Sequence, residues 1–245
     1  RKKNSRIKPP HEIWQACLCF MRELIISSAT PHMVQSSRYR DALALALLAL
    51  RPLRRRNSSN LILGQHLTLE HGIWHCVIPG EETKDGEAIA FTLPQNHAFM
   101  RVFNHYLTTE RQVLLKQPLL NLEAVPSLRG PLWLTNRSKI MSGHGFYYAI
   151  VRISTELLGA PINPHLLRDC AASAISSEAP ENILAASRIL GHSNLTTTLS
   201  HYEQSSMLAA GANLMTTIHE IQTIEPIAEK SETDRLPFHH FKDLM

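Results

Sequence analysis

Apolar residues recur at helical spacing along most of this chain. In several long segments a hydrophobic side chain returns every three or four positions, the period that collects such side chains on one face of an α-helix. The expected helices are His11–Ser27, Arg38–Leu50, His97–Leu115, Ser142–Leu158, Pro164–Ser176, Pro180–Leu190 and Ser206–Ile221. Arg38–Leu50 is apolar nearly all round, so it is expected to be buried, whereas Ser28–Ser37 is expected to be a loop.

Between residues 61 and 94 the pattern changes to short segments rich in β-branched and aromatic residues. Lys84-Asp85-Gly86 is typical of a hairpin turn, and it would place Lys84 at an exposed tip. The expected strands are Leu61–Leu69, Ile73–Ile78 and Ala88–Leu93, and Leu132–Asn136 is a further candidate. The predicted fold class is therefore α+β: mainly α-helical, with a small three-stranded antiparallel sheet.

Composition adds few constraints beyond those of an ordinary globular protein. The chain has 245 residues, of which 44% are hydrophobic and 19% charged, enough for one large domain or two small ones. Its longest apolar run, Ala42–Leu50, is too short to span a membrane, and there is no signal peptide. Cys17 and Cys19 fit neither a disulfide framework nor a zinc site. We therefore expect a cytoplasmic protein with reduced cysteines and no bound metal.

The charges are distributed unevenly. Residues 1–56 carry 12 Lys and Arg against 3 Asp and Glu, a net +9, whereas residues 203–245 carry 3 against 7, a net −4. Basic clustering of this kind favours a polyanionic partner such as DNA, although a merely solvated face is the plainer alternative. The chain opens with RKKNSRIKPP, a basic extended linker, and we expect it to be the C-terminal part of a longer protein.

The strongest candidate chemistry lies in residues 164–202, which contain PHLLRD, LGH and SHY. Arg168 can bind phosphate oxygens through two N–H groups, and His165 and His192 can donate hydrogen bonds or move protons near neutral pH. Tyr202 is a possible oxygen nucleophile. Asn163 is expected to cap a helix whose first turn carries His165 and Arg168, where the helix dipole favours an anion. The combination indicates the handling of a phosphate group.

In this order, the motifs HLLR, LGHSNLTTT and a following tyrosine resemble the catalytic domain of the tyrosine recombinases, the phage integrase family. The resemblance runs from about His11 to about Leu208. It implies a basic interdomain linker at 1–10, a catalytic domain at 11–208, and a C-terminal helix and tail at 209–245 that is a candidate for docking on a neighbouring subunit. The family also has a helical N-terminal DNA-binding domain, which we do not expect within these 245 residues.

The same resemblance assigns roles to individual residues. Tyr202 matches the nucleophile, Arg54 and Arg168 the arginines that bind the scissile phosphate, and Lys84 the general acid on the hairpin. His165 matches the histidine that helps to accept the tyrosine proton, and His192 the histidine that donates a hydrogen bond to the phosphate. Further basic residues are candidates for contacts with the DNA backbone: Arg55, Arg56, Lys2, Lys3 and Arg6.

Two positions depart from the family pattern. The family usually has an acidic residue three positions after the first arginine, but this chain has Asn57, which removes a charge that helps to hold Arg54. Arg51 and Arg55 are weaker candidates for that arginine. The tyrosine usually lies nine residues after the LGH histidine, where this chain has His201, and Tyr202 is the tenth. The threonine-rich segment before Tyr202 is a poor helix former, so we expect it to be mobile.

The expected function is site-specific DNA recombination or integration through a covalent 3′-phosphotyrosine intermediate, without metal, ATP or other cofactor. The expected partners are double-stranded DNA and further copies of the chain in a synaptic tetramer, in a bacterial or phage nucleoid. Three alternatives remain: a catalytically silent DNA-binding protein, a type IB topoisomerase-like enzyme, and a metal-dependent phosphodiesterase suggested by the 14 histidines. HGIWH (residues 71–75) lacks the glutamate of a zinc-protease motif.

Overall fold

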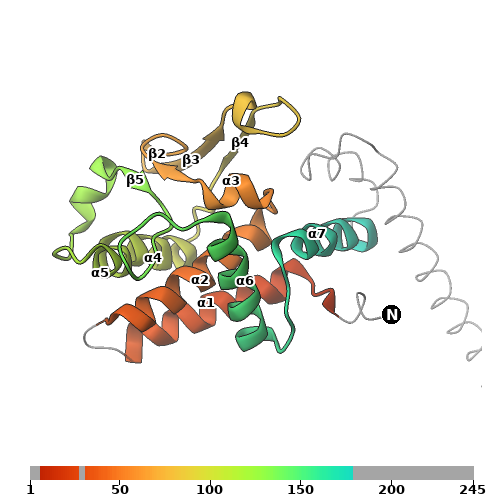
Figure 1. Cartoon of the computed structure of the whole chain (residues 1–245), viewed down its shortest axis with the longest axis horizontal. Coiled ribbons are helices and arrows are strands. Elements are labelled where there is room, and N and C mark those ends of the chain that lie inside the picture. The colour runs from red at the N-terminus through yellow and green to blue at the C-terminus, as the bar shows by residue number, and fades with distance from the viewer. Residues whose placement is uncertain (1–5, 28–30, 179–245) are drawn as a thin grey trace, which may run out of the picture. The chain divides into compact units, whose positions relative to one another are not determined.

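A computed structural model describes residues 6–27 and 31–178 of the chain (Figure 1). The described residues all belong to one compact unit. None of their helices combines the length and the apolar character that crossing a membrane requires. The helices expected at Pro180–Leu190 and Ser206–Ile221 lie outside the described residues.

Helix α2 is the centre of the helical layer. It spans Met33–Leu50 and packs along α1 (Pro10–Ser27), and Tyr39, Leu43 and Leu45 on it are fully buried. The expectation of a buried helix is confirmed. The expectation of a loop up to Ser37 was wrong, because His32 caps the helix and its ring Nδ1 accepts a hydrogen bond from the backbone N–H of Gln35 (3.5 Å).

The segment expected as one helix over His97–Leu115 is helical throughout but changes its winding. It comprises α4 (His97–His105), a π-helical turn at Tyr106–Glu110, and α5 (Arg111–Leu115). Asn96 caps its start by accepting a hydrogen bond from the N–H of Phe99 (2.8 Å). Lys116, in the left-handed conformation at φ 58°, ends it.

Two further helices complete the described helical part. Helix α6 spans Gly143–Leu158; Ser142 caps its start, and Gly159, at φ 67°, ends it. Both boundaries agree with the sequence prediction. Helix α7 spans Pro164–Glu178 and packs against α1 and α2.

The sheet has five strands in the order β4-β3-β2-β1-β5 rather than the expected three. The strands are β1 (Ile62–Leu63), β2 (Leu67–Glu70), β3 (Ile73–Ile78), β4 (Ile89–Thr92) and β5 (Gly130–Pro131). The β2–β3–β4 part is antiparallel as expected, with Thr68 opposite His75 and Val77 opposite Ala90. Strand β1 runs parallel to β2 and antiparallel to β5, so the sheet as a whole is mixed.

The expected first strand, Leu61–Leu69, is divided by a turn. Gly64 adopts a positive φ of 77°, a conformation that favours glycine, and the N–H of His66 donates to the carbonyl of Ile62 (2.8 Å). The candidate strand at Leu132–Asn136 is not formed as predicted; Gly130–Pro131 forms β5, and Leu134 makes one bridge with Ile140. The three-stranded antiparallel sheet is corrected accordingly, and the mainly helical α+β class stands.

A short helix joins the sheet to the helical layer. Helix α3 spans Arg55–Ser59, and in Figure 1 it lies between the strands and helices α6 and α7. The indole N–H of the buried Trp133 donates to the carbonyl of Ser58 (2.7 Å), and Trp133 also contacts the ring of Phe146 on α6. The core therefore fixes α3, and with it the residue that precedes it, Arg54.

Candidate active site

The start of α7 is built as the sequence predicted. The side-chain oxygen of Asn163 accepts hydrogen bonds from the N–H groups of His165 (3.0 Å) and Leu166 (2.9 Å). This is the usual way in which a helix start satisfies its unpaired N–H groups. His165 is exposed in the first turn, whereas Arg168, one turn later, is buried with only 8% of its surface exposed.

Arg168 connects α7 to the segment that leads into α3. Its Nη1 donates to the carbonyl of Pro52 (2.9 Å), two residues before Arg54. Burial lowers the pKa of Arg168 from its ordinary value, and the positive charge of Arg54 lowers it further, while Asp85 and Asp169 raise it. The hydrogen bond to Pro52 thus places Arg168 beside the segment that leads to Arg54, and the charges of Arg54 and Asp85 act on its pKa although they are far away in the sequence. An arginine stays protonated in such surroundings because its ordinary pKa is so high.

Arg54 occupies the N-cap position of α3 and is partly shielded from water. Its side chain is 29% exposed, and its guanidinium forms an ion pair with the carboxylate of Asp85, whose side chain is 22% exposed. Asp85 lies in the connection between β3 and β4. The structure thus brings together two arginines and one acidic residue from three separate parts of the chain.

The connection that carries Asp85 also carries Lys84. It begins with a 3₁₀ turn at Gly80–Glu82, and the hydroxyl of Thr83 donates to the carbonyls of Gly80 and Glu87, each at 2.9 Å. A methyl group at Gly80 would overlap the carbonyl oxygen of Gly86, so the turn requires a residue without a side chain there. Lys84 is exposed at the tip, as its turn sequence indicated.

Sequence comparison then identifies the family. The sequence profile of the phage integrase family matches residues 21–208. The chain belongs to the phage integrase family. In structure it is similar to the XerH site-specific recombinase, solved bound to its difH substrate as a pre-cleavage complex, with a TM-score of 0.52 and 19% identity. The match covers 79% of this chain and 50% of the XerH chain, so this chain spans about half the length of that recombinase. Comparison with the curated protein sequences gave no match.

Several residues that resemble the family's catalytic set are near one another in the described part. Arg54 and Arg168 lie within electrostatic reach, Lys84 is next to the ion-pair partner of Arg54, and His165 precedes Arg168 by one turn. His192, Tyr202, Lys2 and Lys3 lie outside the described residues, and so does His201. The roles of all these residues stay predictions.

Asn57 stands where the resemblance leads one to expect an acidic residue, three positions after Arg54. Asn57 is buried, and its side-chain N–H donates to the carbonyl of Glu82 (3.1 Å), the last residue of the 3₁₀ turn. The carboxylate beside Arg54 comes instead from Asp85. Sequence reasoning missed Asp85, although an acidic residue next to Lys84 was a visible signal once position 57 lacked one.

The other arginines near α3 differ in exposure. Arg55 and Arg56 are exposed, as backbone contacts to DNA would require. Arg51, a weaker candidate for the first arginine, instead packs over the ring of Phe91 on β4, at 5.5 Å from the ring centre. Arg6 donates to the carbonyl of Pro161 (3.5 Å).

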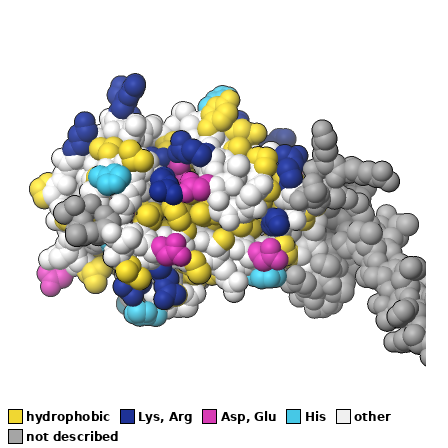
Figure 2. All heavy atoms as spheres, turned by 90° about the horizontal axis from the view of Figure 1, so that it is seen from below, with side chains coloured by type: hydrophobic (Ala, Val, Ile, Leu, Met, Phe, Trp, Pro, Cys, Tyr) yellow, Lys and Arg dark blue, Asp and Glu magenta, His cyan; other side chains and the backbone are white. Residues whose placement is uncertain are grey.

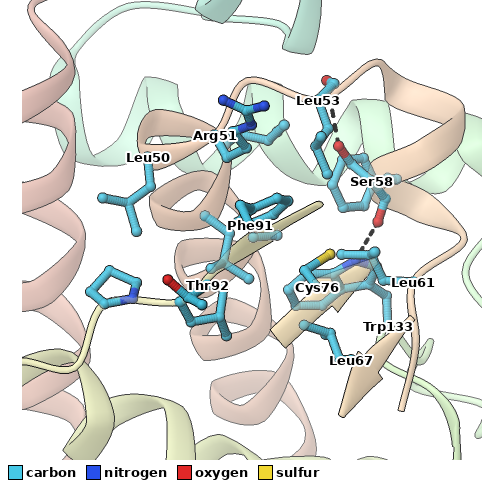
Figure 3. Close-up of a pocket in the computed structure, with 16 residues that line it drawn as sticks. Leu50, Arg51, Leu53, Ser58, Leu61, Leu67, Cys76, Phe91, Thr92 and Trp133 are labelled. Atoms are coloured by element: carbon cyan, nitrogen blue, oxygen red, sulfur yellow. Dashed lines mark hydrogen bonds between the residues drawn. The ribbon is translucent and has the colours of Figure 1, made fainter. Parts of the chain in front are cut away.

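A cavity of about 220 Å³ lies between the end of α2 and the sheet (Figure 3). It is lined mainly by apolar side chains, among them Leu50, Phe91 and Trp133, with the guanidinium of Arg51 pointing away from its centre in the picture. Burial raises the pKa of Cys76 in this cavity to about 12, so its thiol is not a ready nucleophile. The cavity is unsuited to a phosphate, and we assign it no catalytic part.

Figure 2 shows the helical side of the molecule. On that face, Lys and Arg side chains are scattered among acidic, histidine and hydrophobic ones. Among residues 6–27 and 31–178, no cluster of three or more His, Cys, Asp or Glu has an arrangement that could hold a metal ion. The group around Arg54 and Arg168 is therefore the best candidate site for DNA chemistry in the described part of the chain.

Proposed function

We propose that this chain is the catalytic part of a site-specific DNA recombinase that cleaves and rejoins strands through a covalent 3′-phosphotyrosine. One observation carries the proposal. In a member of the phage integrase family, Arg54, Arg168 and the Lys84 hairpin converge from three separate parts of the sequence. Two guanidinium groups with an ammonium group nearby suit a phosphodiester, which presents two charged non-bridging oxygens and one leaving oxygen.

The proposed reaction gives each of the predicted site residues one role. The Tyr202 hydroxyl oxygen attacks the scissile phosphorus while the bond to the 5′ oxygen breaks, and His165 helps to accept the phenolic proton. Lys84 donates a proton to the departing 5′ oxygen. Arg54, Arg168 and His192 bind the non-bridging oxygens as negative charge builds up on them. One phosphoester replaces another, so rejoining needs no ATP, and the set requires no metal.

The partners are proposed on the same basis. Double-stranded DNA lies across the face that carries α3, α7 and the hairpin, where the exposed Arg55 and Arg56 contact its phosphates, and Lys2, Lys3 and Arg6 track the backbone further along. A catalytic domain at 11–208 follows the linker at 1–10, and the acidic tail at 209–245 docks on the next subunit of a synaptic tetramer. The reaction takes place in the cytoplasm, on nucleoid or phage DNA.

The deciding experiment uses a nicked suicide substrate that contains the cognate inverted-repeat site. Attack beside the nick releases a short fragment, so that the protein stays covalently attached to DNA. We expect the wild-type chain to form this adduct in the presence of EDTA. Tyr202→Phe should bind the same DNA with unchanged affinity and form no adduct, because it lacks only the attacking oxygen.

Two results would contradict the proposal. A wild-type chain that binds the site and never forms an adduct is a DNA-binding protein and not a recombinase. An adduct from Tyr202→Phe at wild-type yield would mean that another residue attacks, and mapping the DNA-linked peptide would show whether it is the neighbouring His201.

A further inference from the structure

The hairpin that carries Lys84 is tied to α3 at two points. At its base, the Asn57 side chain donates to the carbonyl of Glu82 (3.1 Å), and the buried His66 contacts the Glu82 carboxylate (3.2 Å). At its tip, Asp85 forms the ion pair with Arg54. Residue 54 of the α3 segment thus holds residue 85 of the hairpin, and residue 57 holds residue 82. The two contact points are three positions apart on each segment.

We propose that Asp85 is a positioning residue. Its carboxylate fixes the position of Arg54, which binds the phosphate, and that of the neighbouring Lys84, which protonates the leaving group. The proposal rests on the proposed function, because it assigns Arg54 and Lys84 to the same reaction. Position 57 does not share this task, because it is an asparagine whose side chain bonds to Glu82 at the base of the hairpin.

The contact lies at the surface but is partly shielded from water. The two side chains are 29% and 22% exposed, so solvent weakens their attraction less than it would at a fully open surface. The negative charge of Asp85 also reaches Arg168, where it opposes the effect of Arg54. It therefore reduces the repulsion that would otherwise separate the two guanidinium groups before DNA arrives.

The carboxylate need not compete with the DNA phosphate for Arg54. The contact uses Nη1, and the planar fork of a guanidinium carries N–H groups on three nitrogens, a geometry with which one arginine can bind a carboxylate and a phosphate together. A held guanidinium also loses less side-chain entropy when the phosphate binds.

Lys84 depends on Asp85 because the two are neighbours at the tip. The base of the hairpin is fixed by Asn57, Thr83 and the close approach of Gly80 to Gly86. Those contacts reach Thr83 on one side and Gly86 on the other, and the Arg54–Asp85 pair fixes the two residues between them. Without it, the ammonium group of Lys84 would sample positions from which it cannot reach the 5′ oxygen.

This dependence can be tested through the leaving group. In a substrate with sulfur in place of the bridging 5′ oxygen, the bond from the tyrosine oxygen to phosphorus forms and the phosphorus–sulfur bond breaks. The sulfur leaves as a thiolate with the bonding electron pair. A thiol has a pKa of about 8.5, so the thiolate needs no proton from Lys84. A variant whose only defect is the placement of Lys84 is therefore rescued by this substrate.

The experiment measures single-turnover cleavage of both nicked substrates by full-length wild type and variants. We expect Asp85→Asn to cleave the oxygen substrate about 100-fold more slowly, the size of effect expected from a displaced catalytic group. On the sulfur substrate it should recover the part of the rate lost through Lys84 and keep the part lost through Arg54, whereas Lys84→Ala should approach the wild-type rate. Asp85→Glu should recover part of the lost rate. Glu87→Gln, which removes the same charge from the same exposed loop, should cleave both substrates like wild type.

A second measurement needs no DNA. Hydrogen exchange of the backbone N–H of Thr83, which donates to the carbonyl of Gly80 (3.0 Å), should become faster in Asp85→Asn and stay unchanged in Glu87→Gln, while exchange in α2 stays unchanged in both. Hydrogen exchange thus tests the Arg54–Asp85 contact even if the wild type forms no adduct. The absence of an adduct would contradict the proposed recombinase function but not the contact.

Three outcomes would overturn the inference. Wild-type or faster cleavage of the oxygen substrate by Asp85→Asn would show that the carboxylate is dispensable or competes with the phosphate. Equal slowing on both substrates would show that it acts through Arg54 without involving Lys84. Unchanged exchange at the hairpin would show that the pair does not order the tip.

Discussion

At the scale of single residues, the burial of Arg168 is the feature with the clearest chemical consequence. The same side chain is shielded from water, hydrogen-bonded to Pro52 and close to the charge of Arg54. Only a cation with a very high ordinary pKa stays charged there at any pH used for an assay. The position therefore requires an arginine for its charge as well as for its two-pronged hydrogen bonding.

Arg168→Lys tests this requirement. A lysine starts from a pKa near 10.4, and burial and Arg54 would lower it, so it would lose its charge as the pH rises through the lowered value. We expect cleavage to fall by about 100-fold at neutral pH. The cleavage rate of this variant should fall further as the pH rises, and that fall should begin at a lower pH than in wild type. Rates of adduct formation between pH 6 and 10 measure this.

The matched control is Arg137→Lys, the same substitution at an exposed turn, which should leave both rate and pH profile unchanged. A flat profile in Arg168→Lys, parallel to that of wild type, would mean that the surroundings of Arg168 do not disfavour a positive charge.

At the scale of elements, local sequence determines where the helices that carry the site begin. Asn163 and Ser142 each accept backbone hydrogen bonds at a helix start, and Gly159 ends α6 in the left-handed conformation. These residues act on their immediate neighbours in the chain, which is why the sequence predicted them correctly. The π-helical turn at Tyr106–Glu110 has no such local signal; the hydroxyl of Tyr106 bonds to the carbonyl of Leu132 (2.7 Å), a contact across the core.

Asn163→Ala measures the contribution of the cap on α7. The variant leaves two N–H groups without their acceptor, so we expect the free energy of unfolding to fall by about 1 kcal/mol. Urea denaturation followed by circular dichroism gives the value. Asn163→Asp keeps an acceptor oxygen in place and should stay close to wild type, and a loss as large as that of the alanine variant would argue against capping.

At the scale of the whole described unit, buried charges connect the helical layer. Asp41 on α2 is 1% exposed and accepts hydrogen bonds from Arg40 (2.6 and 2.9 Å) and from Arg152 on α6. Arg40 also donates to the carbonyl of Leu134, next to Trp133, which contacts α3. A chain of contacts therefore runs from α6 through α2 to the segment that supports Arg54.

Asp41→Asn tests how far stability depends on this network. Removal of one charge leaves the buried Arg40 without its carboxylate, so we expect a loss of roughly 3–5 kcal/mol in the free energy of unfolding. Chemical denaturation measures it.

Glu156→Gln is the comparison, since its pair with Arg38 is much more exposed, at 35% and 42%, and should contribute less than about 1 kcal/mol. Equal losses in the two variants would show that burial of the Asp41 pair adds nothing.

The sequence alone determined the features that depend on neighbours along the chain. Most of the helices up to α7, the cap at Asn163, the hairpin at Lys84 and the motifs of the phage integrase family could be predicted, because periodicity and turn chemistry act over a few residues; the start of α2 and its cap at His32 could not. The tertiary structure alone decided the rest. Strand β5 pairs with β1 from about seventy residues away, and Asp85 supplies Arg54 with the carboxylate that Asn57 lacks. Such contacts depend on how separate elements pack in space, and no local pattern marks both partners.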